Sequence, residues 1–173
     1  MKKINLFVYH ANDDDPKKCS AKKLQRFGHA ELYHKIHRLP KQLILLNPYA
    51  KKSLSPTDKE KSENQGILAI DCSWVHAEEV FQKLSSHHMS RSLPFVIAVN
   101  PVNYGKVLKL STLEAFAAAL YIIGHQQQAE TILQIYKWGP HFLQMNHEPL
   151  EEYRQARDSS EIIQIMKQYI DTE

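Results

Sequence analysis

Four short apolar runs, each ending in a polar or turn residue, constrain the fold of this chain more than any other feature. They are residues 4–10 (INLFVYH), 43–48 (LILLNP), 66–73 (GILAIDCS) and 94–100 (PFVIAVN). Runs of this length are typical of strands that are buried on both faces. Because segments with helical patterns lie between them, they predict βαβ units and a parallel sheet.

Capping signals locate the helices of the chain. Ser55 followed by Pro56 starts one helix, and residues 74–88 carry apolar side chains at helical spacing. Beyond Asn100 the pattern becomes helical: a capping box, Ser111-x-x-Glu114, opens an apolar helix, and further helices are expected over residues 126–138 and 160–170. We therefore predict an α/β fold with a parallel-sheet N-terminal lobe, residues 1–92, docked against an all-helical C-terminal lobe, residues 93–173.

Several classes of function are disfavoured by missing motifs. The chain has five glycines and contains neither a G-x-x-x-x-G-K-[ST] loop, nor a G-x-G-x-x-G turn, nor a G-x-S-x-G elbow. The two cysteines do not have metal-ligand spacing, and His34-x-x-His37 has no further ligand nearby in sequence, so no metal site is expected. The N-terminus lacks a cleavage site and no apolar run is long enough to span a membrane, which favours a cytoplasmic protein.

Positive charge is concentrated in one segment of the chain. Residues 17–42 contain eight Lys and Arg but one acid, Glu31, in a protein whose net charge is +3. A basic stretch on an otherwise acidic body is typical of a polyanion-binding protein, although a solvated lysine-rich surface has the same composition. We expect the polyanion contacts to come from Lys17, Lys18, Lys22, Lys23 and Arg26.

Polar residues gather where the predicted strands end. In an open α/β sheet, ligands bind beyond the carboxyl ends of the strands. The residues expected there are 10–20, 47–48, 71–74 and 100–105. Asp71 followed by Trp74 would place a carboxylate beside an aromatic wall. The alternative is that Asp71 caps the following helix, the more common role of a lone Asp at such a position, and that Trp74 belongs to the core.

A set of motifs then resembles a known family. DPKKCSAKKL (15–24), LSPTD (54–58), DCSW (71–74), RSLPFVIAVNPVNYGKVLKLSTLEAFAAALYIIG (91–124), WGPHF (138–142) and NHEPLEEY (146–153) occur in this order. Together they resemble the ribosome-biogenesis aminocarboxypropyltransferases of small-subunit ribosomal RNA, in a compact archaeal form. The resemblance implies a SPOUT-like fold with a deep trefoil knot. It also implies transfer of the 3-amino-3-carboxypropyl group of S-adenosylmethionine to N3 of a (methyl)pseudouridine by a monomeric enzyme.

The resemblance further implies roles for individual residues. The turn 100–105 would offer backbone groups to adenine, Ser111 and Thr112 would face the methionine carboxylate, and Asp71 would orient or deprotonate the acceptor. The full set of implied cofactor contacts is Cys19, Ser20, Leu46, Pro48, Ile70, Asp71, Trp74, Ala77, Leu93, Asn103, Tyr104, Ser111 and Thr112. Two alternatives remain open: a SPOUT methyltransferase, which shares the cofactor, and a non-catalytic ribosome-assembly factor, which needs no cofactor pocket.

Overall fold

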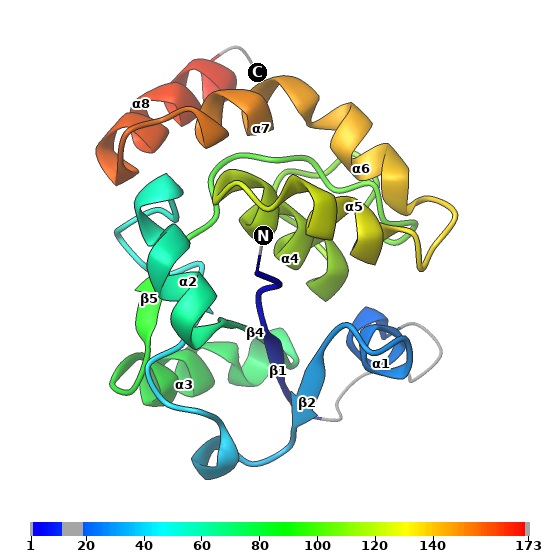
Figure 1. Cartoon of the computed structure of the whole chain (residues 1–173), viewed down its shortest axis with the longest axis vertical. Helices are drawn as coiled ribbons and strands as arrows, with labels where there is room; N and C mark the ends of the chain where they lie inside the picture. The colour runs from blue at the N-terminus through cyan, green and yellow to red at the C-terminus, as the bar shows by residue number, and fades with distance from the viewer. Residues whose placement is uncertain (1, 12–18, 172–173) are drawn as a thin grey trace.

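The computed structural model describes residues 2–11 and 19–171, and for Trp74 the backbone only (Figure 1). The predicted RNA-binding residues Lys17 and Lys18 lie outside the described residues. The described residues form a five-stranded sheet in the order β2-β1-β4-β3-β5, and every pair of neighbours is parallel. Its strands are β1 (Leu6–His10), β2 (Glu31–Tyr33), β3 (Ile44–Leu46), β4 (Ile67–Asp71) and β5 (Met89–Arg91). The predicted parallel sheet is confirmed.

The helices account for most of the second half of the chain. They are α1 (Ser20–Arg26), α2 (Lys59–Gln65), α3 (Trp74–Ser85), α4 (Thr112–Ile122), α5 (Gln126–Leu133), α6 (Gly139–Met145), α7 (His147–Arg154) and α8 (Ser159–Ile170), with short 3-10 turns η1 (Ile36–Arg38) and η2 (Pro56–Asp58). The helix starts predicted at Ser55 and Ser111 are both present: Ser55 opens η2, which leads into α2, and the capping box of Ser111 opens α4. Among the described residues, no helix has the length and apolar character needed to cross a bilayer.

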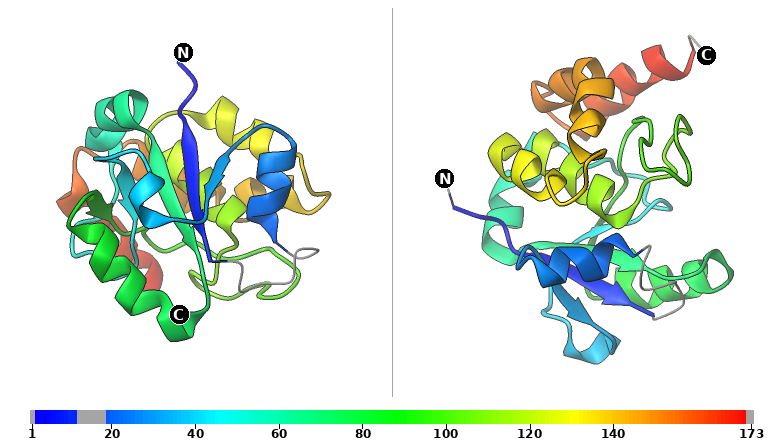
Figure 2. Two further views of the ribbon diagram at one scale, coloured as in Figure 1. Left: turned by 90° about the horizontal axis from the view of Figure 1, so that it is seen from below. Right: turned by 90° about the vertical axis from the view of Figure 1, so that its right-hand side faces the viewer.

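The two faces of the sheet are covered by different helices. Side chains of β1 and β4 that point one way, such as Val8 and Ala69, join a large core with α1 and α4. The intervening residues, such as Phe7 and Leu68, pack with Phe81 of α3 in a smaller core. In the views of Figure 2, α7 and α8 form an outer layer over α4 and α5, which separate them from the sheet. The large core is continuous from the sheet to these outer helices.

One predicted strand is wrong. Residues 94–100 are mostly buried but join no ladder; only an isolated bridge links Ile97 to Val107. Alternate backbone groups bond to side chains instead: Ile97 N–H donates to Asn146 Oδ1 at 2.7 Å, and Val99 N–H donates to Glu114 Oε2 at 2.7 Å. The groups between them bond to the backbone of residues 105–108. The apolar pattern therefore predicted the burial of this segment correctly. Along one edge of the segment, polar side chains from the C-terminal helices take the place that a neighbouring strand would have in a sheet.

The predicted helix over residues 126–138 is also shorter than expected. Helix α5 ends at Leu133, and Gly139 and Pro140 open α6 instead of terminating a helix. Proline is favoured in the first turn of a helix because its missing N–H is not needed there. At Gly139 a Cβ atom would collide with the Leu133 carbonyl, so glycine is required by the close approach of the two helices.

Candidate active site

A cavity of about 220 Å³ opens at the carboxyl edge of the sheet. Strands β3 and β4 end there, and the first turns of α3 and α4 face each other across it. Its walls are Leu46, Asn47, Pro48, Ala69, Ile70, Cys72, Ala77, Phe81, Ser92, Leu93, Leu108, Leu110, Ser111, Thr112 and Ala115. The cavity is therefore mainly apolar, with the hydroxyl groups of Ser111 and Thr112 at the start of α4, and it lies where an open α/β sheet is expected to bind a ligand.

The polar end of the cavity is the first turn of α4. Most of its N–H groups are already engaged: Ser111 N–H donates to Glu114 Oε1, Glu114 N–H to Ser111 Oγ, and Leu113 N–H to Ser20 Oγ. Within the described residues no partner is found for the Thr112 N–H. The capping box and Ser20 therefore satisfy three N–H groups of this helix end. Thr112 keeps both an N–H and a hydroxyl for a ligand.

The turn over residues 100–105 is anchored to the same helix. Glu114 is fully buried, and Asn100 donates to its Oε1 at 2.6 Å while Val99 N–H donates to its Oε2. Asn100 also accepts from Asn103 N–H, which closes the turn. The segment between the turn and α4 contributes Leu108 to the cavity, so this hydrogen-bond network fixes one wall of the cavity.

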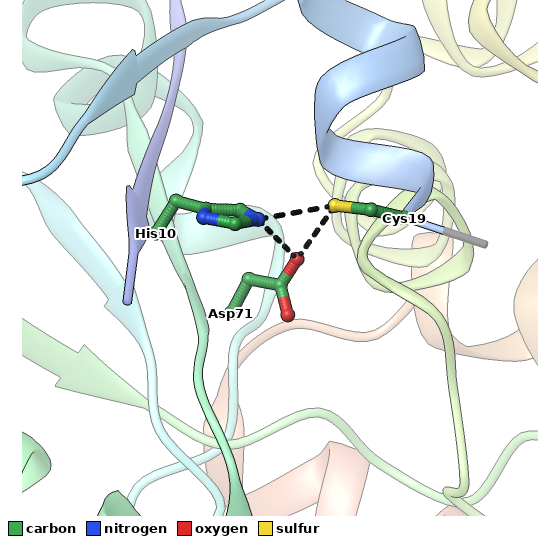
Figure 3. Close-up of side chains that lie close together, drawn as sticks. All are labelled: His10, Cys19 and Asp71. Carbon is green, nitrogen blue, oxygen red and sulfur yellow. Dashed lines mark hydrogen bonds and ion pairs between the residues drawn. The ribbon is translucent and has the colours of Figure 1, made fainter. Parts of the chain in front are cut away.

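A second polar cluster lies at the ends of β1 and β4 (Figure 3). His10 and Asp71 are direct partners in the β1–β4 ladder, and Cys19 precedes α1. The Cys19 thiol donates to Asp71 Oδ2 at 3.1 Å, and His10 Nε2 lies 3.2 Å from Cys19 Sγ and 3.6 Å from Asp71 Oδ2. Burial, followed by the hydrogen bond and charge of Asp71, raises the pKa of the Cys19 thiol to about 11. The thiol is consequently a protonated donor at neutral pH.

The structure gathers seven of the predicted cofactor residues around the cavity. These are Leu46, Pro48, Ile70, Ala77, Leu93, Ser111 and Thr112. Three others, Cys19, Ser20 and Asp71, do not line it: Cys19 and Asp71 form the polar cluster with His10, and Ser20 holds α4. Trp74 opens α3 beside the cavity wall, but its side chain lies outside the described structure.

Asn103 and Tyr104 are not among the residues that line the cavity. The Tyr104 side chain is exposed, and its ring stacks on His141 of α6 with a hydrogen bond of 3.2 Å between the two side chains. The sequence placed the turn correctly after an extended segment, but it could not reveal that Asn103 closes the turn through its backbone while Tyr104 points toward α6.

Three of the predicted RNA-binding residues, Lys22, Lys23 and Arg26, lie on α1. Lys23 Nζ lies 3.9 Å from the centre of the Tyr136 ring, which stacks in turn on Trp138. Lys22 is half-buried and Arg26 is exposed. This positive face follows Cys19 directly in the chain, so the predicted RNA-binding residues and the polar cluster are neighbours.

Several cavity residues were not predicted from the sequence. Phe81 stands four residues after Ala77, a helical spacing that would have identified it as part of the same wall. No sequence pattern identifies Leu108 as a cavity residue, yet it lines the cavity and has a left-handed backbone conformation, with φ of 57°. A bulky residue in that conformation is uncommon and marks local strain.

Comparison with known proteins gives two family matches. Residues 44–170 match the family described as "Ribosome biogenesis protein, C-terminal". Residues 4–39 match "Possible Fer4-like domain in RNase L inhibitor, RLI". Iron–sulfur clusters are held by sets of cysteine thiolates, most often four. Because the matched segment contains Cys19 alone and the whole chain has two cysteines, its residues do not fit such a cluster.

Individual relatives extend over almost the whole chain. Proteins from Methanosarcina acetivorans (49% identity, covering 96% of this chain and 95% of the relative) and Methanocaldococcus jannaschii (46%, 95% and 95%) are both named 16S rRNA aminocarboxypropyltransferase. A solved structure described as the SAM-dependent rRNA:acp-transferase Tsr3 from Vulcanisaeta distributa is similar at a TM-score of 0.86, with 40% identity over 98% of this chain and 97% of that chain. With this identity over nearly its full length, the chain belongs to the 16S rRNA aminocarboxypropyltransferase family of ribosome biogenesis proteins.

Proposed function

We propose that this protein transfers the 3-amino-3-carboxypropyl group of S-adenosylmethionine to N3 of a (methyl)pseudouridine in small-subunit ribosomal RNA and releases 5′-methylthioadenosine. The observation that carries the proposal is the cavity, because seven residues predicted from the family resemblance line it. The names of the relatives support the same reaction. The reaction belongs to the cytoplasm, and the enzyme acts as a monomer.

The chemistry of the walls suits the two ends of S-adenosylmethionine. Leu46, Pro48 and Phe81 offer apolar surface to the adenine ring. At the opposite end the Thr112 N–H and hydroxyl would receive the methionine carboxylate, where the N-terminus of α4 favours a negative charge. Trp74 would complete the apolar wall.

The choice between alkyl and methyl transfer depends on which carbon of the sulfonium faces the RNA. We propose that the methyl group is held against Ala77 and Trp74, which leaves the Cγ atom in line with the acceptor. The N3 lone pair then forms the new bond to Cγ, the C–S electrons stay on sulfur, and the neutral thioether leaves with its methyl group. Asp71 accepts or orients the N3 proton.

The RNA approaches across the basic face of α1. Lys22, Lys23 and Arg26 supply the described positive charges there, and Lys17 and Lys18 precede them in sequence. Cys19 immediately precedes the same helix and contacts Asp71, so an acceptor nucleotide bound at this face has a short path to the proposed base.

The reaction can be tested with S-adenosylmethionine labelled either in the methyl group or in the aminobutyrate chain, and unmodified small-subunit RNA. Label transfer only from the aminobutyrate chain, with 5′-methylthioadenosine as by-product, is the expected result. Methyl transfer with S-adenosylhomocysteine would establish the methyltransferase instead. Absence of cofactor binding in calorimetry would favour a non-catalytic assembly factor. Thr112→Val should weaken cofactor binding, whereas Thr57→Val, on an exposed residue of η2, serves as the matched control.

We also propose a SPOUT-like topology with a deep trefoil knot, and a division of labour between residues 1–92 and 93–173. The first part binds RNA and cofactor, and the second is threaded through it and completes the cleft. In support, the cavity takes Leu46 and Ile70 from the first part and Ser111 from the second. Pulling on the two termini in a force experiment would test the knot, because a knotted chain extends to less than its full contour length.

A further inference from the structure

The cluster of His10, Cys19 and Asp71 is drawn from three separate elements that meet at one point (Figure 3). His10 and Asp71 face each other in register on parallel strands, so their side chains leave the same face of the sheet. His10 and Cys19 are almost completely buried. The exposed fraction of the Asp71 side chain is 13%. The Asp71 carboxylate thus has limited access to water and lies against two buried polar side chains, His10 and Cys19.

The contacts are made to one oxygen of the carboxylate. Cys19 Sγ and His10 Nε2 both approach Asp71 Oδ2, at 3.1 and 3.6 Å. For Asp71 Oδ1 the described residues supply no side-chain partner. The protonated Cys19 thiol is a fixed donor to Oδ2, which leaves Oδ1 as the oxygen available to another molecule.

Resting on the proposed function, we infer that His10 and Cys19 are positioning residues that hold Oδ2 of Asp71 so that Oδ1 receives the N3 proton of the acceptor base. The N3–H bond breaks, its proton passes to Oδ1, and the nitrogen lone pair forms the bond to Cγ as the C–S bond breaks. Cys19 keeps its own proton throughout. No group beyond the cofactor and the RNA is required.

The cluster is also coupled to the polar end of the cavity. Ser20, the next residue after Cys19, accepts a hydrogen bond from Leu113 N–H at 3.2 Å. Thr112, adjacent to Leu113, lines the cavity. The start of α1 therefore fixes the position of Asp71 and of the α4 N-terminus together, which sets the distance between the proposed base and the cofactor.

Among the described residues, two further titratable groups near the cluster are His34, which follows β2, and Tyr136. The His34 ring meets the His10 ring edge to face at 5.7 Å and contacts the His10 carbonyl through Nδ1. Tyr136, which precedes α6, interacts electrostatically with Cys19, and burial raises its pKa. Neither makes a hydrogen bond to the Asp71 carboxylate within the described structure, so Cys19 and His10 are the groups whose substitution should alter it.

The same three side chains could ligate a divalent cation. Tetrahedral coordination at ordinary Zn–N, Zn–O and Zn–S lengths separates such ligand atoms by roughly 3.4–3.6 Å. The Sγ–Oδ2 and Sγ–Nε2 distances, 3.1 and 3.2 Å, are shorter than this. These two distances correspond to hydrogen bonds, whereas the Nε2–Oδ2 distance of 3.6 Å fits either arrangement, so two of the three separations favour the positioning role.

The test compares Cys19→Ala, which removes the donor, with Cys19→Ser, which keeps one. Single-turnover rates are measured at saturating cofactor and RNA over a range of pH. Cys19→Ala should lower the rate about tenfold, because the carboxylate is no longer held with Oδ1 toward the acceptor. Its pH–rate profile should differ from that of the wild type, because a hydrogen-bond donor to the carboxylate has been removed. Dissociation constants for cofactor and RNA should stay within about twofold, and Cys19→Ser should recover most of the rate.

His10→Leu and His10→Gln form a second pair with the same expectation, and Ser62→Ala, a buried substitution in α2 remote from the cavity, is the control for folding. Asp71→Asn sets the rate without the base. If wild type and Asp71→Asn differ but Cys19→Ala keeps the wild-type rate and pH profile, the positioning role is refuted while the proposed function stands. A wild type that transfers nothing refutes the proposed function itself. Stoichiometric divalent metal in the purified protein, lost in Cys19→Ala, would overturn the positioning role in favour of metal binding.

Discussion

Replacing Glu114 should damage both stability and the cofactor site. Its fully buried carboxylate accepts hydrogen bonds from Val99 N–H, Asn100 Nδ2 and both the N–H and hydroxyl of Ser111. A buried donor left without a partner costs about 1–3 kcal/mol. Glu114→Ala leaves the Val99 and Asn100 donors without this acceptor and removes one half of the capping box with Ser111. We therefore expect a loss of about 3–5 kcal/mol in the free energy of unfolding.

The milder Glu114→Gln keeps the shape of the side chain but turns one acceptor into a donor. That amide must face either the Val99 N–H or the Asn100 and Ser111 donors, and the expected loss is about 1–3 kcal/mol. Because the network fixes the segment between the turn and α4, affinity for S-adenosylmethionine should fall as well. Urea denaturation followed by circular dichroism measures the first effect and calorimetry the second.

A matched control is Glu130→Gln, an exposed glutamate of α5, which should change stability by less than about 0.5 kcal/mol. If Glu114→Gln unfolded at the same urea concentration as Glu130→Gln, the carboxylate would not be the acceptor that holds the turn. If stability fell but cofactor affinity did not, the network would have no part in shaping the cavity.

Three further outcomes are expected. Leu108→Gly should leave stability unchanged or raise it, because it relieves a left-handed backbone, and should still weaken cofactor binding because it removes a cavity wall; calorimetry and urea denaturation together check this. Charge reversal of Lys22 and Arg26 should reduce the salt dependence of RNA binding by roughly one unit of slope per lost phosphate contact and leave cofactor affinity intact, which titrations at several salt concentrations measure. The hydrogen bond from His125 lowers the pKa of Glu63 from its ordinary value. The ionised Glu63 therefore stabilises the folded protein above the pKa that it has in the unfolded chain, and this contribution is lost as the pH falls through the lower pKa of the folded state. Glu63→Gln should make the free energy of unfolding less dependent on pH in that acidic range.

The sequence predicted the central strands and missed the edges of the sheet for a physical reason. Strands β1, β3 and β4 lie in the interior of the sheet, and their apolar runs reflect burial on both faces. The outer strands β2 and β5 read ELY and MSR and are partly exposed. Because an edge strand is covered less completely, it needs no apolar run, and three residues are too few to show a period.

The candidate site, too, was predictable from the sequence in one part and not in another. The rule that ligands bind beyond the carboxyl ends of parallel strands located His10, Pro48 and Asp71 from the sequence alone. That His10 and Asp71 are direct neighbours depends on the register of two strands 61 positions apart in sequence, which no local pattern encodes. The approach of Cys19 to Asp71 depends on how α1 docks on the sheet, so spacing rules for metal ligands or catalytic groups could not have found the cluster.

The wrongly predicted strand clarifies what the family motifs encode. Along residues 95–99, alternate backbone groups are bound by side chains of the helical half: Tyr153 donates to the Phe95 carbonyl at 2.8 Å, Asn146 bonds both backbone groups of Ile97, and Glu114 accepts from Val99 N–H. The spacing of two residues is that of a strand edge, with three side chains in place of a neighbouring backbone. Asn146 and Tyr153 are the first and last residues of the motif NHEPLEEY. That motif therefore specifies how the helices close over the chain, whereas DCSW contributes Cys72 to the cavity wall and Asp71 to the polar cluster.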